Sequence, residues 1–222
     1  MPLANTNAAT FTNLYSIVSY SMGMEIAGSI KLDGVAADYI EVDYLVMGLR
    51  DGLGNYMPLV EATTAKKILE EFQEEMKKKA EQKALQEAEA NKRRGEEFLA
   101  LNKSKEDIIT TSSGLQYRII REGKGESPNE DDRIAMHFRS RTIDDVEFNS
   151  SYKHKAPIVI PMRGVIPAWR EALLKMKPGA KWELFVHPDL AYGAREVGKN
   201  VGPYSTVIFE LELVRIEKQE SQ

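Results

Sequence analysis

Cysteine is absent from this sequence and histidine is scarce, with only His137, His154 and His187 present. The lack of cysteine excludes disulfides, thiol nucleophiles and thiolate metal sites, but it suits a reducing or an oxidising compartment equally. The three histidines are spaced unlike any metal-binding signature. We therefore expect an activity that needs neither a metal ion nor another cofactor.

An excess of one charge sign is also missing. The 222 residues include 30 Lys and Arg against 34 Asp and Glu, a formal net charge of -4, and the two signs are interspersed. Binding to a phosphate backbone requires a basic face, so we expect no contact with nucleic acid. No apolar run reaches the roughly 20 residues that cross a bilayer. Residues 1–7 have neither the basic nor the apolar part of an export signal, although a chain from which a signal had been removed would look the same.

Residues 1–60 are expected to form an N-terminal region of short amphipathic helices. Apolar residues recur at helical spacing between Leu14 and Leu53. Gly23 and Gly28 interrupt this pattern, and a glycine weakens a helix by about 1 kcal/mol. Two interpretations stand: the glycines allow close packing of helices, including helices of two chains, or they mark turns.

Residues 61–104 are expected to form one long connecting helix. The run from Ala65 to Leu101 has no proline and one glycine, and it is rich in Lys, Glu, Gln and Ala. At 1.5 Å per residue such a helix would extend about 55 Å. Between Lys77 and Arg94 the apolar positions are too sparse for a heptad seam. We interpret this middle part as a solvated strut, with a coiled coil or a disordered segment as alternatives.

Residues 105–222 are expected to form an α+β domain. Short β-branched and aromatic runs between Gly and Pro turns predict strands at Leu115–Ile120, Arg133–Ser140, Ile158–Ile160, Lys181–Val186 and Thr206–Ile216. From Pro167 to Met176, apolar residues at i, i+3, i+4 and i+7 predict one helix that packs on the sheet. Strands combined with a single covering helix are typical of an α+β fold.

The sequence has no candidate nucleophile for covalent catalysis. Cysteine is absent, no serine lies in a nucleophile-elbow context, and no histidine has a suitable partner. Large apolar side chains are instead distributed over strands, a loop and a helix start, namely Phe138, Phe148, Val165, Ile166, Trp169, Tyr192 and Phe209. Core packing explains any one of these aromatic residues taken alone. Together they suit a dry and nearly uncharged pocket.

The order and spacing of several motifs resemble the FKBP-type peptidyl-prolyl isomerase domain. The motifs are His137–Ser140, Glu147–Ser151, Val165–Trp169, Ala191–Ala194 and Thr206–Leu213. This resemblance implies a curved antiparallel sheet with one packed helix, and cis-trans isomerisation of X-Pro bonds. Such a reaction needs no nucleophile, because its barrier of about 18–20 kcal/mol comes from amide resonance and falls when a dry site favours the twisted amide.

The resemblance also implies roles for individual residues. Trp169 is the floor of the pocket, and Tyr192 and the backbone N–H of Ile166 donate hydrogen bonds to the substrate. The substrate-binding side chains are Phe138, Phe148, Ile158, Val165, Val201 and Phe209, with Val201 on the loop that closes over the proline. Macrolides such as rapamycin or tacrolimus would bind there as inhibitors.

Asn149 stands at a catalytic position where the family usually has an aspartate. A neutral amide there replaces a carboxylate that helps to orient the site, so we expect lowered or altered activity. Phe138 replaces a more usual tyrosine, and Ile158 stands where an aromatic residue is common. A second interpretation is therefore a proline-binding chaperone with weak catalysis. A third is a structural spacer with an occluded pocket.

Motifs outside the isomerase domain resemble its Mip (macrophage infectivity potentiator) and FkpA branch. They are Ser19–Glu25, Gly48–Asp51, Gly95–Ala100 and Ser113–Tyr117. That resemblance implies a V-shaped homodimer joined through N-terminal helices, with chaperone activity on unfolded or proline-containing protein clients. It also implies a place in the bacterial cell envelope, in the periplasm or at the outer membrane, with the export or lipoprotein signal absent from this sequence.

Overall fold

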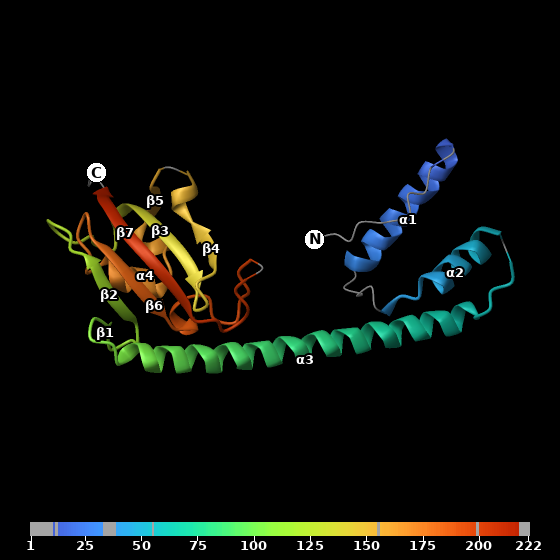
Figure 1. Cartoon of the computed structure of the whole chain (residues 1–222), viewed down its shortest axis with the longest axis horizontal. Coiled ribbons are helices and arrows are strands. Elements are labelled where there is room, and N and C mark those ends of the chain that lie inside the picture. The colour runs from blue at the N-terminus through green and yellow to red at the C-terminus, as the bar shows by residue number, and fades with distance from the viewer. Residues whose placement is uncertain are drawn as a thin grey trace. The chain divides into compact units, whose positions relative to one another are not determined.

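The computed structural model describes residues 11, 13–32, 39–54, 56–154, 156–198 and 200–217. The chain divides into two compact units, Met1–Glu81 and Gln82–Gln222. The division falls inside one long helix, so each unit contains part of that helix (Figure 1).

Every regular element in the described part of the first unit is a helix. These helices are α1 (Leu14–Leu32), α2 (Val42–Gly54) and the first part of α3 (Ala62–Lys103). Asn13 caps α1, since its side-chain oxygen accepts a hydrogen bond of 3.0 Å from the N–H of Ser16. Gly23 and Gly28 both lie inside α1, so the interpretation of these glycines as turns is wrong.

The long helix α3 is continuous over 42 residues, which confirms the predicted helix and contradicts the alternative of a disordered segment. Ion pairs one turn apart lie along its first part. Their N–O distances are 3.8 Å for Lys66–Glu70, 3.6 Å for Lys67–Glu71 and 2.7 Å for Lys79–Glu75. Exposed pairs of this kind stabilise a helix only slightly, so the alanine-rich composition contributes as well.

The second unit is built on a seven-stranded antiparallel sheet with the order β1-β2-β6-β7-β3-β4, in which β5 also pairs with β3. The strands are β1 (Ile109–Thr110), β2 (Gln116–Arg121), β3 (Arg133–Thr142), β4 (Glu147–Ser150), β5 (Ile158–Pro161), β6 (Lys181–Val186) and β7 (Val207–Glu217). All five predicted strands are confirmed, with ends that differ by at most two residues. The sequence did not predict β1 and β4, because strands this short contain too little alternation.

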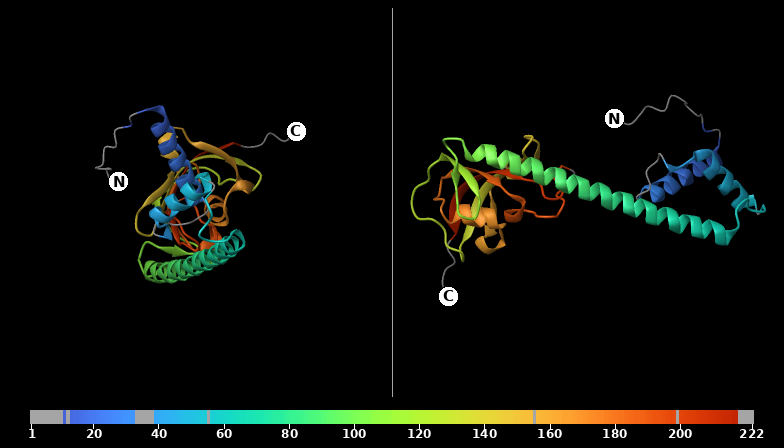
Figure 2. Two further views of the ribbon diagram at one scale, coloured as in Figure 1. Left: turned by 90° about the vertical axis from the view of Figure 1, so that its right-hand side faces the viewer. Right: turned by 90° about the horizontal axis from the view of Figure 1, so that it is seen from below.

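Different helices cover the two faces of the sheet. Successive side chains of a strand point to opposite faces, so Leu184 and Phe185 of β6 belong to separate clusters. α4 (Pro167–Leu173) packs on the face that contains Leu184, and the last part of α3 packs through Leu99 on the face that contains Phe185. Figures 1 and 2 show both helices against the sheet. The predicted α+β architecture is confirmed.

The helix α4 ends three residues before Met176, the predicted end. It begins at Pro167, whose missing N–H is not needed in the first turn. After Leu173 the chain makes a tighter turn, in which the N–H of Lys175 donates to the carbonyl oxygen of Ala172, three residues earlier, at 2.9 Å. Pro178 and Gly179 then turn the chain towards β6, with a φ of +84 at Gly179. Met176 therefore continues the apolar spacing although it lies beyond the end of the regular helix.

Candidate active site

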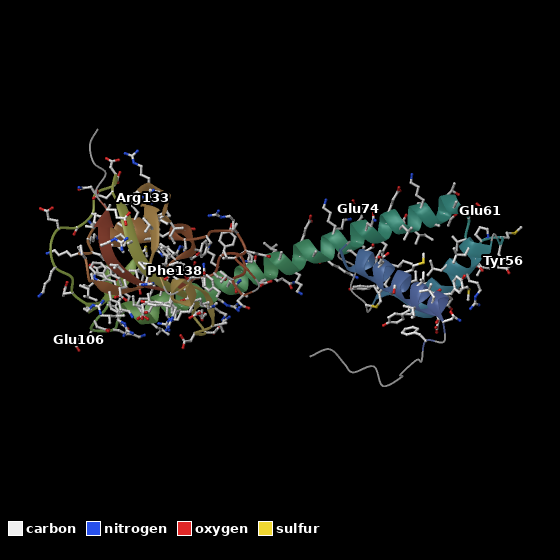
Figure 3. All side chains as sticks on the ribbon, turned by 90° about the horizontal axis from the view of Figure 1, so that it is seen from above. Tyr56, Glu61, Glu74, Glu106, Arg133 and Phe138 are labelled. Atoms are coloured by element: carbon white, nitrogen blue, oxygen red, sulfur yellow. The ribbon has the colours of Figure 1, made fainter. Side chains whose placement is uncertain are left out.

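Three aromatic side chains from different elements form the centre of the site. Phe138 of β3 lies 5.1 Å from Trp169 of α4, and Trp169 lies 5.2 Å from Phe209 of β7, measured between ring centroids. All three are buried. Phe138, labelled in Figure 3, lies among the side chains of the second unit. We call these three rings, together with Phe148 and Tyr192, the aromatic cluster.

Phe148 and Tyr192 form a half-buried edge of the aromatic cluster. The Tyr192 ring lies 6.4 Å from that of Phe148 and 6.2 Å from that of Phe209. Burial raises the pKa of the Tyr192 phenol above its ordinary value, and Arg195 only partly opposes this shift. The hydroxyl therefore stays protonated and able to donate at physiological pH.

Four aliphatic residues complete the surroundings of the aromatic cluster. Val165 and Val201 are buried, whereas Ile158 and Ile166 are half-buried against the same core. Ile166 has extended backbone angles, φ -62 and ψ 156, immediately before Pro167. Its N–H therefore belongs to the segment that enters α4, ahead of the first helical turn.

The loop from Tyr192 to β7 is held by its own backbone hydrogen bonds. Gly193 adopts φ +59, which favours glycine, and its N–H donates to the carbonyl oxygen of Pro188 at 2.9 Å. The N–H of Tyr204 in turn donates to Gly193 at 2.8 Å, and that of Val197 donates to Val201 at 2.8 Å. These bonds hold the parts of the loop that contain Tyr192 and Val201 close to each other.

Asn149 lies beside the aromatic cluster and not within it. It follows Phe148 on β4, pairs with Ser140 of β3 and is exposed. The other predicted residues gather around the cluster, and among them only the Tyr192 phenol is ionisable. Asn149 therefore places a neutral amide at this position, and the other predicted site residues carry no charge at neutral pH.

Ser151 is a site residue that we did not predict from the sequence. It is 1% exposed, and its Oγ accepts a hydrogen bond of 2.8 Å from the N–H of Phe138. The same Oγ lies 3.1 Å from Nδ1 of His137. Ser151 therefore fixes the backbone of a cluster residue. The only sequence signal was its place at the end of the Glu147–Ser151 motif.

Within the described ranges of the chain, no group of three or more His, Cys, Asp or Glu side chains is placed to hold a metal ion. None of the helices in the same ranges is both long and apolar enough to cross a membrane.

The second unit is thus an antiparallel sheet with α4 on one face, the end of α3 on the other, and the aromatic cluster between the sheet and α4. Two family descriptions match this chain. Residues 16–119 match the domain amino terminal to FKBP-type peptidyl-prolyl isomerase. Residues 124–214 match the FKBP-type peptidyl-prolyl cis-trans isomerase.

Individual relatives agree with these matches. The chain is 36% identical to the outer membrane protein MIP of Legionella longbeachae, over 97% of this chain and 91% of the relative. It is 35% identical to the FKBP-type 22 kDa peptidyl-prolyl cis-trans isomerase of Escherichia coli K12, over 93% and 98%. The crystal structure of FkpA from Escherichia coli matches with a TM-score of 0.75 and 28% identity, over 95% of this chain and 100% of that chain.

The chain belongs to the FKBP-type peptidyl-prolyl cis-trans isomerases, in the branch that includes Mip and FkpA. The resemblance recognised from its motifs is confirmed.

Proposed function

We propose that the aromatic cluster binds the proline of an X-Pro bond in a protein client and that the bond isomerises there. One observation carries this proposal. Five aromatic side chains from separate elements converge on one surface, with a buried centre and a half-buried edge. An apolar pyrrolidine ring suits such a surface, and its contact with the rings would remove water from the neighbouring amide.

The proposed chemistry depends on hydrogen bonds and desolvation. The Tyr192 hydroxyl and the N–H of Ile166 would donate to carbonyl oxygens beside the proline, with Trp169 beneath the ring and Val201 closing over it. A twisted amide has lost resonance and is less polar than a planar one, so a dry site favours the twisted state. Preference for that state over the planar amide lowers the barrier without a covalent intermediate.

Asn149 supports a second candidate, a proline-binding chaperone with attenuated catalysis. The residue is exposed at the edge of the aromatic cluster and carries no charge. If the missing carboxylate orients the substrate, the site would retain proline binding while turnover falls.

Isomerisation of a proline tetrapeptide by the full chain and by Asn149→Asp distinguishes these candidates. Robust turnover by the unmodified protein supports an isomerase in which a carboxylate at this position is dispensable. Turnover near background that Asn149→Asp restores supports the chaperone with attenuated catalysis. Failure of rapamycin and tacrolimus to bind, measured by quenching of tryptophan fluorescence, would instead favour a spacer with an occluded site.

We also propose that the first unit joins two chains in a V-shaped homodimer. Among its described residues none is buried, and large apolar side chains are exposed along α1 and α2. Exposed fractions reach 70% for Leu14, 82% for Tyr15 and 85% for Leu53. A surface this apolar is unfavourable in water, so contact with a second copy is the expected way to cover it.

Sedimentation of Tyr15→Lys tests the proposed dimer. We expect this variant to shift from two chains to one, because a lysine would be buried in the contact. Leu85→Lys is the matched control, since Leu85 is 61% exposed in the charged part of α3 and should leave the assembly unchanged. A single-chain species for the unmodified protein at micromolar concentration contradicts the proposal.

The proposed homodimer would act as a chaperone in the bacterial cell envelope, where two sites can engage one unfolded client with increased avidity. The name of the Legionella longbeachae relative, an outer membrane protein, supports this location. The test is how well each protein suppresses aggregation of an unfolded client. The unmodified chain and Tyr15→Lys are compared in amounts that give equal tetrapeptide turnover. Equal protection by both would show that chaperone activity does not depend on the dimer.

A further inference from the structure

A second concave surface lies in the isomerase unit, away from the aromatic cluster. It is a cleft of about 580 Å³ between α3, the turn that joins β3 to β4, and the loop that precedes β7. Figure 1 shows this loop beside α3. The residues that line the cleft include Glu87, Asn91 and Arg94 of α3, Asp144 of the turn, and Glu196, Val201 and Thr206 of the loop.

The walls of this cleft are held together by side-chain contacts. Nδ2 of Asn91 donates to the carbonyl oxygen of Pro203 at 3.1 Å. Arg94 donates to both carboxylate oxygens of Asp144, at 2.7 and 2.9 Å. Because these bonds join α3 to the loop and to the turn, the cleft is formed before any ligand arrives.

The cleft adjoins the proposed proline site. Val201 lines the cleft, yet it is only 2% exposed and packs in the core cluster with Phe209 and Trp169. One short loop therefore separates the two surfaces. A client that extends from the aromatic cluster past Val201 would reach the cleft with the residues that flank its proline.

The described residues that line the cleft carry an excess of negative charge. Glu87 and Glu196 line it and are exposed, and in the described part of the chain neither has an ion-pair partner. The Asp144 carboxylate is neutralised by Arg94. Among the described residues that line the cleft, two carboxylates therefore remain without a compensating charge, and they favour a cationic ligand.

A buried polar group also lines this cleft. Thr206 is 3% exposed, and its Oγ1 has no hydrogen-bond partner among the described residues. With Asn91 and Asn200, which also line the cleft, Thr206 provides the amide and hydroxyl groups that pair with a peptide backbone. This polar lining differs from the apolar surroundings of the aromatic cluster.

We propose that the cleft is a subsite for the client segment that flanks the proline, and that Glu87 and Glu196 select Lys or Arg in that segment. The inference rests on the proposed proline site, because the cleft would act on a client already held at the aromatic cluster. It assigns α3 a direct part in substrate selection.

Proline tetrapeptides extended by four residues test the subsite. The extension contains two lysines or two glutamates and is placed before or after the tetrapeptide. An exposed ion pair changes affinity about two- to fivefold, so kcat/KM for a lysine extension should exceed that for the matching glutamate extension about fivefold in at least one direction. In Glu87→Gln/Glu196→Gln this ratio should fall below about twofold, while turnover of the unextended tetrapeptide is unchanged.

Glu122→Gln/Glu130→Gln is the matched control, because it removes the same charge at exposed positions outside the cleft. It should keep the lysine preference. Two results would overturn the subsite: equal kcat/KM for lysine and glutamate extensions, or a lysine preference that Glu87→Gln/Glu196→Gln does not reduce. If the tetrapeptide is still turned over in that case, the catalytic proposal stands and only the subsite fails. If the tetrapeptide itself is not turned over, the catalytic proposal fails. Fluorescence anisotropy of labelled extended peptides then tests the subsite, by comparing the affinities of the lysine and glutamate extensions.

Discussion

The indole ring of Trp169 stands perpendicular to the ring of Phe209, with centroids 5.2 Å apart and an interplanar angle of 90°. Phe138 contacts the same indole at 5.1 Å. Edge-to-face pairs contribute about 0.5–1.5 kcal/mol beyond the area they bury. The plane of the proposed pocket floor is therefore determined by two neighbours from different strands.

Trp169→Leu should reduce tetrapeptide kcat/KM at least tenfold and abolish macrolide binding. The substitution removes the floor and leaves a cavity, so the free energy of unfolding should also fall by about 1–3 kcal/mol. Isomerisation assays and urea unfolding measure the two effects. Trp182→Leu is the control, because Trp182 stacks on Tyr117 at 4.4 Å in the same core. Equal loss of activity in both variants would mean that Trp169 acts only through stability.

Tyr192→Phe should lower kcat/KM about three- to tenfold, because one neutral hydrogen bond to the substrate is lost. The free energy of unfolding should change by less than about 0.5 kcal/mol, since the ring and its packing remain. Burial raises the pKa of the Tyr192 phenol, so the activity of the unmodified protein should not decline up to about pH 9. Unchanged kcat/KM in Tyr192→Phe would remove the hydroxyl from the mechanism.

Stability should fall at alkaline pH through Tyr152. Its hydroxyl donates to Glu212 at 2.9 Å, and burial together with this bond raises the pKa of Tyr152. The folded state then binds the proton more tightly than the unfolded state. The stabilisation is complete below the unfolded pKa of about 10 and is lost as the pH rises above it.

Urea unfolding between about pH 8 and 11 measures this loss. Tyr152→Phe should reduce the alkaline decline, whereas Tyr204→Phe, at an exposed tyrosine of the same unit, should leave it unchanged. Identical alkaline slopes for the unmodified protein and Tyr152→Phe would contradict the linkage.

Gly95→Ala should destabilise the isomerase unit by about 1–3 kcal/mol. A Cβ at Gly95 would lie 2.2 Å from Oγ1 and 2.9 Å from Cβ of Thr206, so α3 or the loop must move. At a helix position with open space around it, Gly→Ala would instead raise the free energy of unfolding by about 1 kcal/mol. A decrease at Gly95 would therefore indicate the close contact with Thr206. Urea unfolding of Gly95→Ala/Thr206→Ala should recover part of the loss, while strictly additive effects would argue against the contact.

Local patterns predicted the elements that are long or strongly periodic. α3 contains a long run of helix formers, and β6 alternates from Lys181 to Leu184 before it ends in two further apolar residues, so local sequence is enough to indicate both elements. β4 escaped prediction because only Phe148 of its four residues is apolar, and its pairing with β3 supplies what local preference lacks. The end of α4 was predicted too late because turn residues beyond it continue the apolar spacing.

The sequence by itself determined the helical first region, the α+β second region, the family and the identity of the aromatic residues, because each depends on local periodicity or on motif order. Only the tertiary structure decided which side chains meet. The ring centroids of Phe148 on β4 and Tyr192 on the loop before β7 come within 6.4 Å, and Asn91 reaches Pro203 across 112 residues of chain. Such contacts are made by packing between distant segments, and neighbours along the chain do not report them.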